Sequence, residues 1–441
     1  MEKRPSVAMI RSTIRLNSER GIPRLVTRLH DRAGFEVDVA ARVRAILEDV
    51  KRRGDVAVVE EVRAHDWHCP GPSALKVPQK ILAKALADLS SDLREALGSA
   101  AGSIGAFHEC QRPACCKPSD RGGAMMGVET LPLESVGLYV PGGRAAYPST
   151  LLMLAIPAQI AGVRRIAVSC PAGPAGLPNS TVLAAAALLG LREVYAVGGA
   201  AAVGAFAFGT RTIPRVDKIF GPGNAWVAEA KRQVFGEVGI DAVAGPTELV
   251  VLSDGSSPAD FVAADLLAQA EHDPLASPVL LTTDPAEPAR VRAELARQLA
   301  CSPRAAIQQQ SLCGRGALVI CANREVACAA AQALAPEHLS ILARRPAEWA
   351  RRAPSAAAVF LGAWTPEAAG DYGAGPNHSL PTGGTARFSS PVGVWDFVRQ
   401  RSFLQLSRPA LRRMSPWMQA LALAEGLHGH AASLRVREEA P

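Results

Sequence analysis

Glu337 and His338 stand side by side in "LAPEHLSIL", residues 334–342, where a proline ends one helical pattern and an apolar run follows. A carboxylate and an imidazole at the mouth of a strand could exchange protons with a bound substrate. An ordinary histidine pKa of about 6.5 suits a general base at neutral pH. A polar turn on the surface is the alternative that this stretch alone leaves open.

Gln269 and His272 lie in "ADLLAQAEHD", residues 264–273. Val262, Leu266 and Gln269 follow helical spacing, so the carboxamide falls on an otherwise apolar stripe that His272 extends. A carboxamide facing a core costs roughly 1–3 kcal/mol unless it is partnered. The pair could offer one oxygen and one nitrogen to a metal, although a hydrogen-bonded core glutamine explains this stretch more simply.

Two further stretches carry metal-compatible side chains. "GDYGAGPNHSLPTGG", residues 370–384, must form a tightly turned loop and contains Asp371 and His378, and "AEGLHGH", residues 424–430, contains Glu425 and His430. Nitrogen and oxygen ligands of this kind suit a zinc-like ion with one position open for substrate. The candidate ligands are Gln269, His272, Asp371 and His430.

Other clusters give weaker signals. "HDWHC", residues 65–69, has metal-capable side chains but no matching second half, so we expect no metal there. "GPGN", residues 221–224, follows the strand-like run 216–220 and opens a helix, which is a plausible place for a phosphate or a ribose.

The elements that must position these residues follow an alternating pattern. Short apolar runs alternate with helical stretches, which predicts parallel sheets with helices on both faces. The runs are 135–140, 165–170, 193–199, 216–220, 248–254, 278–283, 316–322 and 357–362. Residues 36–63 predict two helices separated by a Gly-Asp break.

The two blocks of strands have similar length and rhythm, so we expect an α/β fold with two doubly wound, Rossmann-like domains. The second domain is predicted at 135–246, and the first is discontinuous, with residues 35–134 as a helical lead-in to 247–390. Residues 1–34 are predicted to form an N-terminal arm, and 391–441 a C-terminal helical tail that carries no strand signal.

Composition excludes several classes of protein. The 441 residues are 48% hydrophobic and 20% charged, and the net charge of +7 is scattered, so we expect no nucleic-acid partner. Nine cysteines without regular spacing favour reduced thiols in a cytoplasmic protein. No apolar run approaches the ~20 residues of a membrane span.

Taken in order, six stretches resemble the histidinol dehydrogenase family, and the resemblance covers roughly residues 35–434. They are "VGLYVPGGRAAYPST", "VDKIFGPGNAWVAEAKRQVFGEVGID", "ADLLAQAEHD", "LAPEHLSI", "GDYGAGPNHSLPTGGTARFSS" and "AEGLHGHA". The resemblance implies a homodimer that oxidises L-histidinol to L-histidine in two NAD-dependent steps through the aldehyde. It also implies one zinc ion per subunit.

The resemblance assigns roles to particular residues. His338 matches the general base for the substrate hydroxyl, and Glu337 matches the group that activates water for the aldehyde-to-acid step. Tyr139 and Asn224 match contacts to NAD. The zinc set is Gln269, His272, Asp371 and His430. Contacts to the substrate come from Thr247, Gln269, His272, His338, Asp371, Glu425 and His430.

Two positions depart from the family pattern. Ala201 in "GGAAA" replaces a glutamine that contacts NAD, and Thr247 in "GPTE" replaces a serine that contacts substrate. They keep open a paralogue that oxidises a different primary alcohol to its acid. A zinc-binding protein that has lost catalysis is a further alternative, which the retained Glu337 and His338 disfavour. The family's tail crosses to the partner subunit, so His430 and Glu425 would complete the other subunit's site.

Overall fold

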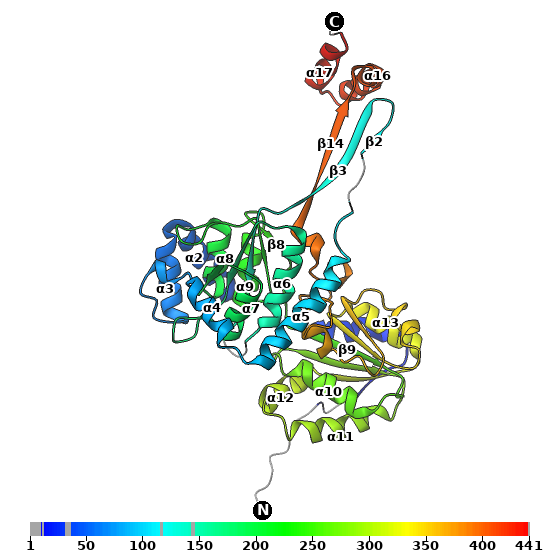
Figure 1. Ribbon diagram of the computed structural model, residues 1–441. Coiled ribbons are helices and arrows are strands. Elements are labelled where there is room, and N and C mark those ends of the chain that lie inside the picture. The colour runs from blue at the N-terminus through cyan, green and yellow to red at the C-terminus, as the bar shows by residue number, and fades with distance from the viewer. Residues whose placement is uncertain (1–9, 11–12, 31–36, 115–117, 143–145, 440–441) are drawn as a thin grey trace, which may run out of the picture.

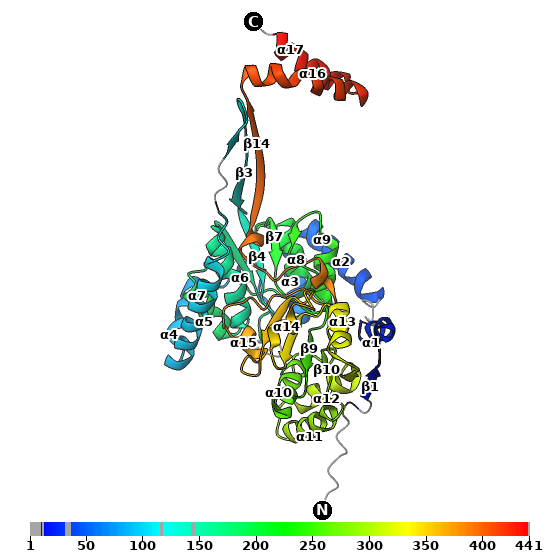
Figure 2. The same ribbon diagram turned by 90° about the vertical axis from the view of Figure 1, so that its right-hand side faces the viewer.

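The structure, a computed structural model, describes residues 10, 13–30, 37–114, 118–142 and 146–439. A body built on two parallel sheets carries a narrow arm that projects from it and ends in two helices (Figures 1 and 2). Within these residues, no helix is both long and apolar enough to cross a membrane.

A six-stranded parallel sheet forms one half of the body. Its strand order is β1-β11-β10-β9-β12-β13. The strands are β1 (Thr13–Leu16), β9 (Glu248–Ser253), β10 (Ser277–Thr282), β11 (Ala317–Cys321), β12 (His338–Leu342) and β13 (Ala358–Leu361). One face is covered by α1 (Ile22–His30), α13 (Arg324–Leu334) and α14 (Pro346–Ala350), the other by α10 (Ala259–Ala270), α11 (Glu287–Leu299) and α12 (Ala305–Gly314).

A five-stranded parallel sheet forms the other half, with strand order β6-β5-β4-β7-β8. The strands are β4 (Ser135–Tyr139), β5 (Arg165–Ser169), β6 (Glu193–Tyr195), β7 (Lys218–Phe220) and β8 (Gly239–Ile240). One core contains α4 (Gln79–Ala87), α5 (Ser91–Glu109), α6 (Pro148–Ala161) and α7 (Ser180–Leu188). The opposite core contains α2 (Val37–Arg53), α3 (Asp55–His65), α8 (Gly199–Phe208) and α9 (Ala225–Val234).

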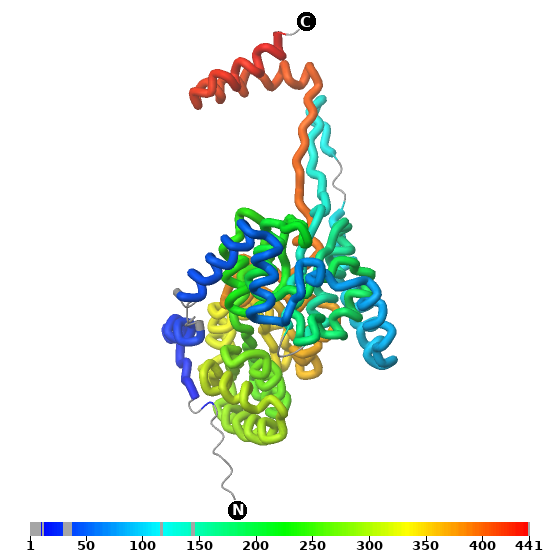
Figure 3. Tube along the Cα trace, turned by 90° about the vertical axis from the view of Figure 1, so that its left-hand side faces the viewer, coloured from blue at the N-terminus to red at the C-terminus, as the bar shows by residue number. Residues whose placement is uncertain are grey.

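The arm is an antiparallel ribbon. β14 (Val398–Leu406) pairs along its whole length with β3 (Ala124–Pro132), and the short β2 (Ser119–Asp120) adds to the other side of β3. The ribbon leads to α16 (Arg408–Ala424) and α17 (His428–Glu439), which pack on one another at its far end (Figure 3).

The predicted parallel α/β architecture is confirmed. Each of the eight predicted runs overlaps a parallel strand, and both sheets have helices on both faces. The break predicted between the first two lead-in helices is also present, because Gly54 adopts a left-handed conformation with φ of 57° between α2 and α3.

Three expectations about the chain's outer parts are wrong. Helices α2–α5 were expected to join the 247–390 block, but they share their cores with the five-stranded sheet. The described part of 1–34 is no separate arm, since β1 pairs with β11. The tail is not purely helical, because β14 lies within 391–441. Amphipathic helices show that they need a partner surface but not which sheet provides it.

Candidate active site

The predicted acid and base lie at the amino edge of the six-stranded sheet. His338 begins β12 and Glu337 directly precedes it, beside the residues that begin the neighbouring strand β9. Both side chains are buried, with 7% of Glu337 and 5% of His338 exposed to solvent. The surface-turn alternative for this stretch is therefore excluded.

Two donors fix one oxygen of the Glu337 carboxyl group. Its Oε2 accepts a hydrogen bond from the Thr247 hydroxyl at 2.7 Å and another from the backbone N–H of Glu248 at 2.9 Å. Burial raises the pKa of Glu337 to about 7, although these two donors oppose the shift. Since Oε2 is occupied by donors, a proton held by this group at neutral pH sits on Oε1.

The backbone sets the tautomer of His338. Its Nδ1 lies 3.0 Å from the carbonyl oxygen of Glu248. Because a carbonyl can only accept, Nδ1 carries the hydrogen and Nε2 keeps its lone pair when the ring is neutral. Nε2 is therefore the nitrogen able to take a proton.

Gln269 ends α10 with one amide atom paired and one unpaired. The side chain is fully buried, and its Nε2 donates to the Thr247 hydroxyl at 2.6 Å. Its Oε1 is buried and has no hydrogen-bond partner among the described residues. An orphaned buried oxygen costs free energy unless a ligand satisfies it. The simpler interpretation, a fully hydrogen-bonded core glutamine, leaves this oxygen unexplained.

His272 and Asp371 approach one another across the site. The two are 3.6 Å apart between Nε2 and Oδ2, and His378 Nδ1 lies 3.6 Å from Oδ1 of the same carboxylate. Burial alone would raise the pKa of Asp371, but the two imidazoles outweigh it and hold the pKa well below its ordinary value. His272 lies two residues beyond the end of α10 at Ala270, so it occupies a turn and not the helix stripe that the spacing predicted.

One buried acid in this site escaped the sequence analysis. Glu367 is 1% exposed, and its Oε1 lies 3.6 Å from His338 Nε2. Neither carboxyl oxygen has a hydrogen-bond partner within the described residues, and burial raises its pKa. Atoms of His338, Glu367 and Asp371 that could bind a metal lie within 4.8 Å of one another. The available signal was its position four residues before Asp371, one helical turn away.

A second feature, a cavity of about 1100 Å³, lies at the carboxyl edge of the five-stranded sheet. Its lining includes residues at or just after the carboxyl ends of β4, β5, β6 and β7, among them the predicted NAD contacts Tyr139 and Asn224. Ala201, which replaces the family's glutamine, also lines it. The Tyr139 hydroxyl accepts from the N–H of Gly199, and the Asn224 side chain caps α9.

The loop that carries Asp371 links the two halves of the body. His378 contacts the Thr150 hydroxyl of α6 through Nε2 at 3.2 Å, and Asn377 donates to the carbonyl oxygen of Met153 at 2.6 Å. The helix that receives both contacts begins shortly after the cavity's Gly142 and Ala146. The segment that follows Asp371 and helix α6 of the other half are thus joined by direct hydrogen bonds.

Two predicted site residues lie far from this centre in the single chain. Glu425 directly follows α16 and His430 lies in the first turn of α17; both are exposed, and these helices form the far end of the arm (Figures 1 and 3). The chain therefore does not bring them to Gln269, His272 and Asp371 by itself.

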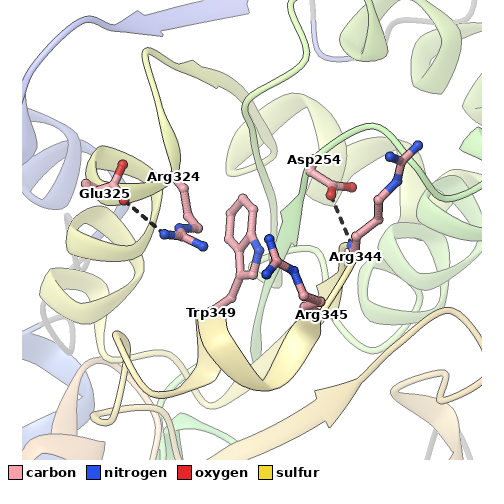
Figure 4. A pocket seen from close by; sticks show the side chains of 6 residues that line it. All are labelled: Asp254, Arg324, Glu325, Arg344, Arg345 and Trp349. Carbon is pink, nitrogen blue, oxygen red and sulfur yellow. Dashed lines mark hydrogen bonds and ion pairs between the residues drawn. The ribbon is translucent and has the colours of Figure 1, made fainter.

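A smaller cavity of about 400 Å³ lies beyond the carboxyl ends of β9 and β12 (Figure 4). Most of its arginine side chains already form ion pairs with neighbouring carboxylates. Arg324 pairs with Glu325 and Glu348, and Arg345 also pairs with Glu348. We do not consider it a candidate site, because the guanidinium groups of Arg324 and Arg345 already have carboxylate partners.

Comparison with known proteins agrees with this geometry. A family model described as histidinol dehydrogenase matches residues 30–438. The histidinol dehydrogenase of Bordetella parapertussis is 49% identical over 406 residues, 92% of each chain, and that of Gluconobacter oxydans is 47% identical over 413 residues, 94% of this chain and 96% of the relative.

A solved structure extends the agreement to the fold. The crystal structure of histidinol dehydrogenase from Elizabethkingia anophelis superposes with a TM-score of 0.90 at 34% sequence identity, covering 97% of this chain and 98% of that chain. The match includes the arm as well as both sheets, since nearly the whole of each chain is covered. This chain belongs to the histidinol dehydrogenase family, a family of oxidoreductases.

Proposed function

We propose that this protein catalyses the zinc-dependent, NAD-linked oxidation of L-histidinol to L-histidine through the aldehyde. Two NAD molecules each accept a hydride, one water molecule supplies the second carboxylate oxygen, and three protons are released. The observation that carries the proposal is the buried Glu337–His338 pair beside the unpaired Oε1 of Gln269. The names of the relatives support histidinol as the substrate.

The residues present fit a zinc ion. Gln269 offers a buried oxygen with no other partner in the described chain, and Asp371 is held ionised beside the His272 ring. These are the oxygen and nitrogen donors that zinc accepts in catalytic sites. The fourth ligand in the proposal is His430 of the partner subunit. When bound, zinc would polarise the substrate oxygen and fix its position.

His338 and Glu337 divide the proton transfers in this proposal. His338 Nε2 takes the hydroxyl proton when the alcohol loses its first hydride, because it is the ring nitrogen with a free lone pair. Glu337 serves the second oxidation, in which water adds to the aldehyde. A carboxyl group with a pKa of about 7 can both accept and return a proton near neutral pH.

The cavity on the five-stranded sheet fits NAD. Ligands of open α/β sheets bind beyond the carboxyl ends of the strands where the strand order reverses, and here the order reverses between β4 and β7. Tyr139 is the last residue of β4, and Asn224 follows β7. We propose that they contact the cofactor, whose nicotinamide supplies the redox chemistry.

The arm supports an isologous homodimer with two shared sites. Its helices leave large apolar side chains uncovered, with Trp417 51%, Leu421 57% and Leu423 43% exposed. A ribbon and a helix pair without a core of their own need a partner surface. In the proposed dimer the arm crosses to the other subunit and delivers His430 and Glu425 to its site.

The function is tested with the purified full-length chain. We expect stoichiometric zinc by mass spectrometry, and two NADH molecules per L-histidinol consumed. A panel of other primary alcohols decides between histidinol and the paralogue alternative, which Ala201 and Thr247 motivate. A kcat/KM for another alcohol well above that for histidinol would favour the paralogue. Absence of zinc together with absence of turnover would refute the proposal.

The shared site is tested by subunit mixing. A His338→Asn protein and a His430→Asn protein should each be inactive. When they are unfolded together and refolded, hybrid dimers contain one site with both residues intact, so part of the activity returns. Mixed mutants that stay inactive, while wild type refolded in the same way recovers, would show that each site is built from one chain.

A further inference from the structure

Asp66 brings a carboxylate to the cavity from an unexpected element. It is the C-cap residue directly after α3, where its backbone N–H donates to the carbonyl oxygen of Val62 at 2.8 Å, and it lines the cavity on the five-stranded sheet. The next residue, Trp67, fixes this segment by donating from its indole to the carbonyl oxygen of Ala196, just after β6. Asp66 is thus anchored against the carboxyl edge of the sheet.

The carboxylate lies over the backbone that follows β5 and β6. A Cβ added to Gly198 would meet Asp66 Oδ2 at 2.9 Å and the Pro171 ring at 2.8 Å. The N–H of Gly198 donates to the carboxylate, and burial raises the pKa of Asp66. Gly198 is the N-cap of α8, so the negative charge also sits at the positive end of that helix.

This position is where dinucleotide-binding sheets normally place an acidic residue. In those folds a glycine-rich turn after the first strand receives the pyrophosphate, and a carboxylate after the second strand receives the ribose 2′-hydroxyl. Here the first two strands are β4 and β5, and Gly142, which lines the cavity, follows β4. The segment after β5, residues 170–179, contains no Asp or Glu. Asp66, which follows α3, lies beside Pro171 of that segment next to Gly198. It can therefore take the place of the acidic residue that the segment lacks.

The described cations that line this cavity have other partners, and His65 only partly offsets the charge of Asp66, since its Coulombic effect on the pKa of that carboxyl group is smaller than the effect of burial. Arg42 stacks over the Trp226 ring at 4.7 Å from its centre, on the side of the cavity formed by α2 and α9. His65 lies 3.7 Å from Glu61, a second carboxylate of the lining. A phosphate next to Asp66 would therefore meet an anion that is poorly screened by solvent.

We propose that Asp66 binds the ribose 2′-hydroxyl of the adenosine half of the cofactor and excludes its 2′-phosphorylated form, making the enzyme selective for NAD over NADP. The inference rests on the proposed NAD-dependent function and adds the residue that distinguishes NAD from NADP. An anionic carboxylate accepts the hydroxyl proton but repels a phosphate in the same place, which is discrimination through an unfavourable contact.

The test measures nucleotide binding separately from turnover. The full-length protein is titrated with ADP-ribose and with its 2′-phosphate, and wild type should bind the phosphorylated form at least about tenfold more weakly. Asp66→Asn keeps an oxygen for the Gly198 N–H and removes the charge, so the two dissociation constants should approach within about threefold. The kcat/KM ratio for NAD and NADP should change in parallel.

Two further variants make the result decisive. Asp66→Ser removes the same charge without introducing an amide, and it should also bring the two dissociation constants closer together. Glu60→Gln, on the same helix but paired with Arg53 outside the cavity, should leave the ratio at the wild-type value. The inference about Asp66 would be overturned, with the proposed function unaffected, by either of two results. Wild type could bind both nucleotides equally, or the ratio of the two dissociation constants could be unchanged in both Asp66 variants. A wild type that binds neither nucleotide would refute the NAD assignment as well.

Discussion

Replacing Glu337 with glutamine should stabilise the metal-free protein at alkaline pH and have little effect at acidic pH. The side chain is 7% exposed, and its pKa is raised from 4.5 to about 7, mainly by burial. Glutamine keeps a carbonyl oxygen for the donors Thr247 and Glu248, and its amide nitrogen takes the place of Oε1. The substitution therefore removes a titrating proton with minimal change of shape.

The magnitude follows from the linkage between proton binding and folding. Between pH 4.5 and 7 the folded state holds a proton on Glu337 that the unfolded state has lost, so wild-type stability falls as pH rises through this range. Each pKa unit corresponds to about 1.4 kcal/mol, which gives about 3 kcal/mol in total. The stability difference between Glu337→Gln and wild type should grow from near zero at pH 4.5 to about 3 kcal/mol above pH 7.

The assay is urea unfolding in the presence of a chelator, at a fixed protein concentration because subunit association contributes to stability. Measurements at pH 5, 6, 7 and 8.5 should trace the rise. Glu294→Gln, at a surface pair with Arg297, should show no comparable pH dependence. A difference for Glu337→Gln that stays constant from pH 5 to 8.5 would refute the view that this carboxyl group is buried and protonated at neutral pH.

Three other substitutions test the site. His338→Asn should slow aldehyde formation by ~10²–10⁴-fold in single-turnover measurements of NADH absorbance, and an undiminished rate would exclude it as the base. Thr247→Val removes the hydroxyl that accepts from the Gln269 amide and donates to Glu337, so it should lower the free energy of unfolding by about 2–3 kcal/mol. Thr247→Ser keeps the hydroxyl and should lower it by less than about 1 kcal/mol in the same urea titration. Asp371→Asn should lose zinc on dialysis, and metal analysis showing full retention would contradict its role as a ligand.

Local patterns were enough to predict two parallel sheets and to single out Glu337 and His338, whose side chains are buried. Parallel strands buried on both faces have continuous apolar sequences, so most of them could be predicted. The short edge strands β1 and β8 were not predicted, nor was the order of the strands within each sheet. Glu337 and His338 were recognisable because two titratable groups stood together at the start of such a run. Glu367 gave no comparable signal, because its burial depends on a fold that brings it to His338 from a separate segment.

The arm was not readable for a physical reason. β14, with the sequence VRQRSFLQL, has no alternation of apolar and polar residues, and none of its positions is buried in the single chain. A ribbon that is not packed on a core is not constrained to show the two-residue period by which strands are recognised. The antiparallel pairing of β14 with β3 joins residues more than 260 positions apart, which no local pattern reveals.

The two sheets use opposite edges, and this explains why a general rule about ligand sites succeeds for one and fails for the other. On the five-stranded sheet the cavity lies at the carboxyl edge, as expected for open α/β folds. On the six-stranded sheet the smaller cavity of Figure 4 lies at that edge, while Glu337, His338 and Thr247 lie at the amino edge. The amino edge faces the loop that bonds to α6 of the other half. In the proposed reaction a hydride passes between substrate and cofactor, so the proposed catalytic groups are expected at whichever edge adjoins the proposed cofactor-binding half. On this proposal, contact between the two halves decides the position of the site.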